Sequence, residues 1–392
     1  MKRLKERFQQ QRLFWWGVLA SLVIKTLIVA FFTPMVLSAY PANDGVTYDR
    51  LGWRVASEWR EGHWASLELN TQTGLRIVAF SYIVGAIYFL SGHQPLAVQW
   101  VNMLISTLGL WFFFKVGRKT IPYGASLSFL LIAFWPSILL WTTLPLKEAW
   151  TFMLTGLLAY GMVSMMECRW KPAWVGIGVA LAGLMLLRPW LAIVALVAMF
   201  PFVLVLYYRV LWQGQTRLQR AVVLLLVFGV GGMLAYQAVQ FSITTSPFSI
   251  ETLNILRERA IEGGSALEFA PYQSWFDVAV QFPTGLVAFL FRPFPWEVDN
   301  LFGSLAALEN LGLLVLLLVS IRWWPVHLEQ VVTIRPLLLM AAGIVGLFAI
   351  LGGNLGTMFR LKIHVLPFLL MFSAFGIMQW FRKFHVFKTN ST

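Results

Sequence analysis

The chain of 392 residues is 59% hydrophobic and only 12% charged, with a mean hydropathy of +0.72. Soluble domains carry roughly 25% charged residues, so this chain lacks the polar surface that a water-soluble fold of its size requires. The composition therefore excludes a soluble globular protein. It predicts an all-α polytopic membrane protein, with residues 1–392 forming a single transmembrane domain.

The reactive residue types exclude several kinds of site. A single cysteine, Cys168, excludes a disulfide framework and any cysteine-based zinc or iron–sulfur site. The five histidines show no paired ligand spacing, and the acids of the predicted outer loops are spread over separate segments. We therefore expect no cofactor and no tightly held metal, and we do not favour a requirement for a divalent cation. We attribute the net charge of +13 to basic loops beside a membrane rather than to nucleic-acid binding.

Hydrophobic stretches long enough to cross a bilayer recur along the chain. The first follows the basic segment 1–12, and its length favours a retained span over a cleaved signal peptide. About ten spans are predicted, at roughly 13–37, 96–114, 125–144, 149–166, 173–187, 191–208, 221–238, 301–321, 336–353 and 363–380. A shorter apolar run at 74–90 is interrupted by polar residues and is expected to be a re-entrant or interfacial helix.

The distribution of charge sets the predicted orientation. Six segments between or beyond the spans hold 18 of the 30 Lys and Arg residues but only three of the 17 acids, so we place them in the cytoplasm. The two long loops, 38–73 and 239–300, hold 12 acids and are placed outside. Within the second loop, the spacing of apolar residues over 250–260 predicts an amphipathic helix. The basic turn at 115–119 lies inside only if the run 74–90 does not cross the membrane. The charge distribution therefore predicts that 74–90 is a juxtamembrane helix.

Charged residues gather where predicted spans end on the outer face, and charges at that depth require a partner or a function. Asp44 lies in an Asp–Gly turn before a stretch with helical spacing, where it can serve as a cap or as a functional acid. Asp49 is interpreted as part of a solvated charged face. Glu148 opens a helix, a position that the helix dipole favours for an acid but disfavours for the adjacent Lys147.

The other outer candidates are mainly cationic. Arg188 stands in a tight turn, where it either extends to lipid headgroups or contacts a phosphate. A proline-rich aromatic turn carries Arg292 and Glu297, for which an aromatic belt at the membrane surface is the alternative interpretation. The last outer turn carries Arg360, Lys362 and His364. Lys and Arg are usually more frequent in cytoplasmic loops than in outer ones, so we favour a bound anion at this positively charged outer turn.

Two of these segments resemble known motifs. The pattern Asp44-x-x-x-Tyr48-x-x-x-Gly52-x-x-x-Ala56, continuing to Gly62, resembles the acidic motif after the first span of the GT-C superfamily. These integral-membrane glycosyltransferases include the protein O-mannosyltransferases and the lipid A aminoarabinose transferase. Glu148 is similar in position to the family's second acidic residue, and a juxtamembrane helix after the first loop also matches. The resemblance covers about residues 40–210.

The resemblance implies an inverting transferase that moves a hexose or pentose from a polyprenyl-phosphate donor to a glycan, lipid or protein acceptor. It implies a multi-pass protein of the bacterial inner membrane, among membrane lipids, with its site facing the periplasm. Asp44 is implied as the general base, with Glu148 as the second catalytic acid. The implied substrate-binding residues are Tyr48, Lys147, Arg188, Arg292, Glu297, Arg360, Lys362 and His364. Two alternatives stay open: a non-enzymatic flippase or transporter of lipid-linked sugars, and a polysaccharide polymerase or ligase.

Overall fold

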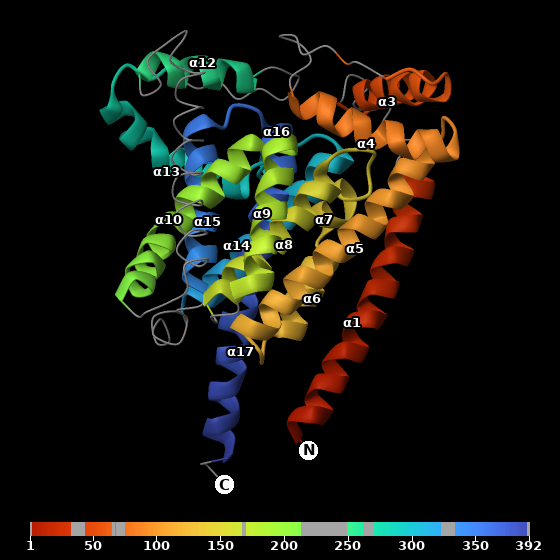
Figure 1. Ribbon diagram of the computed structural model, residues 1–392. Helices are drawn as coiled ribbons and strands as arrows, with labels where there is room; N and C mark the ends of the chain where they lie inside the picture. The colour runs from red at the N-terminus through yellow and green to blue at the C-terminus, as the bar shows by residue number, and fades with distance from the viewer. Residues whose placement is uncertain are drawn as a thin grey trace. The chain divides into compact units, whose positions relative to one another are not determined.

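The computed structural model describes residues 2–32, 44–64, 67, 75–166, 170–212, 249–261, 270–322 and 334–389. Every regular element in these ranges is a helix (Figure 1), which confirms the predicted all-α class. The chain divides into two compact units. The first comprises Met1–Pro189, Val315–Thr333 and Leu366–Thr392, and the second comprises Trp190–Leu314 and Ile334–Val365.

The helices of the two units are as follows. The first unit contains α1 (Lys2–Leu27, continued by a π-helical turn at Ile28–Phe32), α3 (Asp44–Arg60), α4 (Leu75–Ser91), α5 (Pro95–Thr120), α6 (Ala125–Ala133), α7 (Pro136–Trp141), α8 (Glu148–Met166), α9 (Trp170–Leu187) and α17 (Leu366–Thr389). The second contains α12 (Ile250–Ile261), α13 (Trp275–Phe291), α15 (Arg335–Leu351), α16 (Leu355–Leu361) and 3-10 turns at Pro295–Glu297 and Lys362–His364. The unit boundaries cut α10 (Pro189–Trp212) at its first residue and α14 (Leu301–Ile321).

Several helices are long and apolar enough to cross a membrane. Within the described ranges there are four, or five if Leu355–His364 and Leu366–Phe381 form one broken span. The four are Gln9–Phe31, Pro95–Thr120, Glu148–Met166 and Leu301–Ile321. The described residues do not reach the predicted ten. The apolar stretches of α9, α10 and α15 are shorter than 18 residues, the predicted span 125–144 is divided into the short helices α6 and α7, and 221–238 lies outside the described ranges. Exposed apolar side chains such as Trp15 (63%) and Leu308 (65%) suit contact with lipid.

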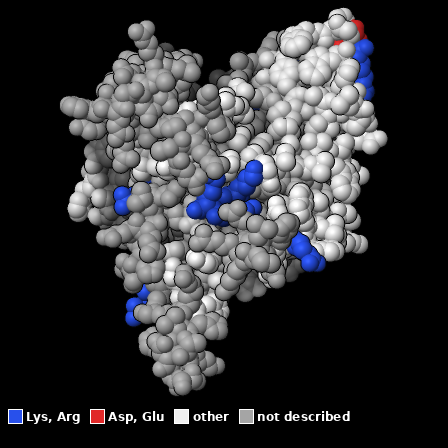
Figure 2. All heavy atoms as spheres, turned by 60° about the horizontal axis from the view of Figure 1, so that its bottom comes forward, with Lys and Arg blue, Asp and Glu red and all other residues white. Residues whose placement is uncertain are grey.

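The basic end of α5 illustrates how charge is placed along the first unit. Pro95 starts the helix, where its fixed φ suits the first turn, and Arg118 and Lys119 stand in the last turn, where the helix dipole favours cations. Figure 1 shows this end of α5 at the same end of the unit as the N-terminus of α1. On the face shown in Figure 2, Lys and Arg gather in several patches, while Asp and Glu show only at the upper edge.

Cysteine labelling tests the predicted orientation. In a Cys168→Ser background, we expect Arg118→Cys to react with a membrane-impermeant maleimide only after the membrane is opened, because the α5–α6 turn is basic. Glu61→Cys should react from outside in intact cells. Glu61 is preferred to Gly62, whose φ of 77° would strain any other residue. Labelling of position 118 in intact cells would contradict a non-crossing α4.

Helices α3 and α4 pack closely against each other and carry the first acidic motif. A Cβ atom added to Gly52 would lie 2.4 Å from Cγ1 of Val84, and one added to Gly85 would lie 2.5 Å from Cγ1 of Val55. The two glycines therefore let the helix backbones approach at their crossing. Tyr48 on α3 stacks edge-on against Phe80 on α4, with 4.7 Å between the ring centroids. Figure 1 shows both helices lying across one end of the first unit rather than along α1.

The second unit also forms helices where the sequence supplies clear signals. Helix α13 begins with a capping box, in which Ser274 Oγ accepts from Asp277 N at 3.3 Å and Asp277 Oδ2 accepts from Ser274 N at 2.9 Å. The expected amphipathic helix over 250–260 is present as α12. Asn254 of α12 bonds both backbone groups of Tyr272, which fixes this helix to the start of α13.

Candidate functional site

A group of charged residues forms in the first unit from three separate parts of the chain. Asp44 is the first residue of α3, Lys147 and Glu148 stand at the start of α8, and Arg188 follows α9. One Arg188 guanidinium nitrogen donates a hydrogen bond to Glu148 Oε1. Arg188, Glu148, Asp44 and Arg76 all act electrostatically on Lys147. We call Asp44, Arg76, Lys147, Glu148 and Arg188 the charged group. The structure thus brings together four of the residues singled out in the sequence.

Glu148 and Arg188 form a buried ion pair. Their side chains are 1% and 5% exposed. Burying two ions costs several kcal/mol each, and their mutual attraction offsets this only when they are in contact. The pair therefore fixes the turn after α9 against the start of α8. Arg188 is committed to a carboxylate, which weakens its interpretation as a residue that extends to lipid headgroups.

Asn102 on α5 holds the segment that precedes the charged group, although no motif in the sequence marks it as a functional residue. Its side-chain amide donates to the carbonyl oxygens of Leu144 and Leu146 at 2.6 and 2.9 Å, while its Oδ1 accepts from Trp150 Nε1 at 3.0 Å. The side chain is fully buried. These bonds position the two residues that follow, Lys147 and Glu148. The one sequence signal was a polar amide side chain within an otherwise apolar span, where polar groups need a hydrogen-bond partner.

Lys147 is buried in the charged group and lies over an aromatic ring. It is 2% exposed, with its Nζ 5.7 Å from the ring centroid of Tyr48. Among the described residues, no carboxylate lies within 4.0 Å of this nitrogen. The pKa of Lys147 is lowered to about 6, chiefly by burial and next by the charge of Arg188. Glu148 and Asp44 oppose this shift without reversing it.

The depressed pKa of Lys147 predicts how stability depends on pH. Between about 6 and the ordinary value of 10.5, the unfolded chain binds a proton that the folded chain does not, so the free energy of unfolding rises with pH through this interval. We expect Lys147→Met to unfold at a higher temperature than wild type at pH 6.5, with the difference shrinking by pH 9.5. Tryptophan fluorescence during heating in detergent measures this. A constant difference across the interval would contradict the burial argument.

The Asp49 side chain is 34% exposed, as expected of a charged face, but it is also bonded to two residues that the sequence did not indicate. Its Oδ1 accepts from Tyr88 OH at 2.5 Å, and both carboxylate oxygens lie 3.1 Å from His93 Nε2. Burial, and then the Asp49 carboxylate, raises the pKa of Tyr88, so the phenol stays a donor. Helix α3 is thereby fixed to α4 and to the loop that follows it. The sequence pattern could not reveal partners 39 and 44 residues away.

The remaining predicted residues lie in the second unit. Arg292 binds Glu297 through its Nε at 2.8 and 3.0 Å, and this hydrogen bonding is the main cause that lowers the pKa of Glu297. Lys362 is fully buried and donates to Leu290 O at 3.0 Å and to Asn310 Oδ1 at 2.7 Å. Buried His364 contacts Trp190, with 5.7 Å between the ring centroids, and Arg360 is partly exposed.

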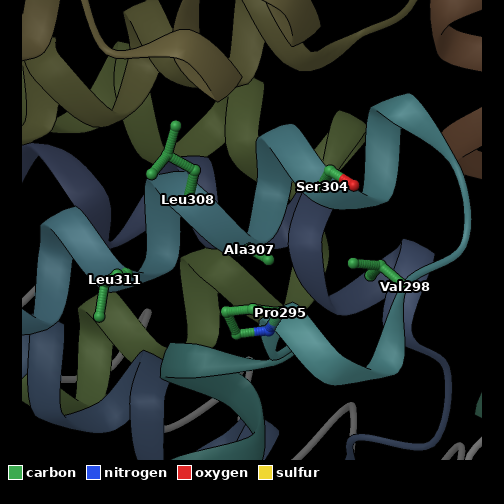
Figure 3. A pocket seen from close by; sticks show the side chains of 6 residues that line it. All are labelled: Pro295, Val298, Ser304, Ala307, Leu308 and Leu311. Atoms are coloured by element: carbon green, nitrogen blue, oxygen red, sulfur yellow. The ribbon is translucent and has the colours of Figure 1, made fainter.

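The second unit also contains an open pocket of about 230 Å³ (Figure 3). Its lining residues are Pro295, Val298, Ser304, Ala307, Leu308 and Leu311. The lining is apolar apart from the Ser304 hydroxyl, so it suits hydrocarbon better than a sugar or a phosphate. In the described ranges, no three His, Cys, Asp or Glu side chains lie close enough together to hold a metal ion.

Comparisons of the chain with known proteins find no match among family models, curated proteins or solved structures. The resemblance to the GT-C superfamily therefore rests on the motifs around Asp44 and Glu148 alone.

Proposed function

We propose that the protein is a membrane glycosyltransferase that moves a sugar from a polyprenyl-phosphate donor to an acceptor on the outer face of the membrane. The main support is that Asp44 and Glu148, about a hundred residues apart and both in motif positions, belong to one charged group with cationic neighbours. A carboxylate beside buried cations suits a reaction that needs a base and releases an anion.

In the proposed reaction, an acceptor hydroxyl oxygen attacks the anomeric carbon while the bond from that carbon to the phosphate oxygen breaks. Asp44 takes the hydroxyl proton, and the polyprenyl phosphate departs with the bonding electrons. Displacement from the opposite side inverts the anomeric configuration. Arg76 and Lys147 neutralise the phosphate, while Glu148 holds Arg188 and shapes the group. The polyprenyl chain stays in the bilayer, which needs no polar protein contact.

An assay in reconstituted vesicles tests the proposal. Purified protein is given a panel of polyprenyl-phosphate sugars and candidate glycan, lipid or protein acceptors, and the lipid products are followed by mass spectrometry. We expect free polyprenyl phosphate to accumulate in step with a glycosylated acceptor. Glu61→Gln, which removes an exposed acid of the same outer loop, serves as the matched control. No lipid cleavage with any donor in a folded preparation would overturn the proposal.

A second candidate, transport of lipid-linked sugars, is favoured by ionisable residues inside candidate spans. Lys25 lies within Gln9–Phe31, is 1% exposed, and donates to Ser106 Oγ at 2.5 Å. Lys362 is buried in Leu355–His364, which forms a broken span or a re-entrant loop together with Leu366–Phe381. Charged residues at such positions often mark substrate or ion pathways. The vesicle assay separates the two functions, because a transporter moves the intact lipid from one leaflet to the other without cleaving it.

A further inference from the structure

Lys147 differs from the other cations of the charged group in how its charge is balanced. Arg188 is bonded to Glu148, and Arg76 is exposed to solvent. Lys147 is 2% exposed, and no carboxylate of the described ranges lies within 4.0 Å of its Nζ. A buried ammonium in that setting is costly unless an anion approaches it or it gives up its proton.

We propose that Lys147 binds the phosphate of a polyprenyl phosphate and takes up one proton as it does so. The identity of the lipid rests on the proposed function, whereas the coupling of anion binding to proton uptake rests on the geometry of the charged group. Within the described ranges, the titratable and charged side chains around Lys147 are Asp44 and Tyr48 from α3, Arg76 from α4, Glu148 from α8 and Arg188 after α9.

The proton coupling matches the charge that sugar transfer creates. The donor is a phosphodiester with one negative charge, and the released polyprenyl phosphate is a monoester that carries about two at pH 7.5, since its second pKa is about 6. The reaction also releases the acceptor's hydroxyl proton. If Asp44 passes that proton on to Lys147 Nζ and so returns to its carboxylate form, a neutral amine and a monoanion become an ammonium and a dianion. The total charge of the buried group is then unchanged, and the dianion meets a full positive charge.

Calorimetric titration with a short-chain polyprenyl phosphate in nonionic detergent tests this coupling. Comparing HEPES with Tris at pH 7.5 gives the number of protons exchanged on binding. We expect an uptake of about one proton, because an amine with a pKa of about 6 is almost fully neutral before binding. The affinity should fall about tenfold for each unit of pH between 7 and 8, since binding requires protonation.

Three variants make the result specific to Lys147. Lys147→Arg keeps a permanent charge and should bind without proton uptake or pH dependence. Lys147→Met should bind roughly ten- to a hundredfold more weakly, the loss expected for one charge-assisted bond. Arg54→Gln, which removes an exposed cation paired with Glu58 on the same helix, should behave as wild type.

The outcomes separate this inference from the proposed function. Binding without proton uptake in wild type, or unchanged proton uptake in Lys147→Met, would overturn the coupling while leaving sugar transfer intact. The same uptake with inorganic phosphate alone would overturn the assignment to a lipid. Proton uptake that requires Lys147, in a protein that cleaves no donor, would support the anion site while contradicting the transferase.

Discussion

Replacing Asp44 by asparagine is expected to lower the rate of sugar transfer by about two to four orders of magnitude, the range assigned to a positioned general base. Asparagine has nearly the same shape and serves helix starts about as well as aspartate, so α3 should still form. Binding of the donor should survive, because the proposed cations are untouched. Initial rates of acceptor glycosylation in vesicles, together with the thermal midpoint of the variant, measure the effect.

The control for this experiment has to be chosen from the structure. Asp49 is unsuitable, because it bonds Tyr88 and His93 and its loss should loosen α3. Asp299→Asn makes the same chemical change at an exposed residue and should leave the rate unchanged. Full transfer by a stably folded Asp44→Asn protein would show that Asp44 only supports the helix start.

Breaking the buried Glu148–Arg188 pair should give the largest loss of stability. Removing one partner leaves an uncompensated buried charge, which costs about 3–5 kcal/mol. Glu148→Gln and Arg188→Met should therefore each lower the thermal midpoint sharply. The double variant Glu148→Leu/Arg188→Met removes both charges and should regain most of the loss. Thermal unfolding of the purified proteins in one detergent measures all three, and transfer should be absent even from the stable double variant.

The Arg292–Glu297 pair provides a matched comparison. Its side chains are 29% and 19% exposed, so Glu297→Gln should cost much less, about 1 kcal/mol. Equal losses for Glu148→Gln and Glu297→Gln would contradict the argument from burial. Active sugar transfer by the double variant would instead show that Glu148 and Arg188 are not needed for the reaction.

Local sequence signals predicted much of the helix pattern. The predicted span 125–144 contains Pro136, and the helix breaks there: α6 ends at Ala133 and α7 begins at Pro136. The spacing after Asp44 predicted α3, and the apolar positions at 250–260 predicted α12. The number of crossing helices was less predictable. Hydropathy marks an apolar stretch but cannot show whether a helix of borderline length, such as α9 or α15, spans a bilayer or packs within the protein.

The sequence indicated which residues belong to the candidate site but not which of them contact each other. Charges at the outer ends of predicted spans require a partner or a function, so Lys147, Glu148 and Arg188 stood out in the sequence. Their contacts depend on how separate helices pack, which short motifs do not encode. The pairing of Arg188 with Glu148 and the burial of Lys147 were therefore not foreseen. Asn102 escaped notice because a single amide in a span carries no motif.

The most direct test of the central claim is a structure determined by electron cryomicroscopy with polyprenyl phosphate added in lipid nanodiscs. We predict phosphate density within hydrogen-bond distance of Lys147 Nζ, beside Asp44, and its loss in Lys147→Met. A phosphate bound instead at Arg292 or Lys362, with ordinary bilayer lipid beside Lys147 and Asp44, would contradict the account.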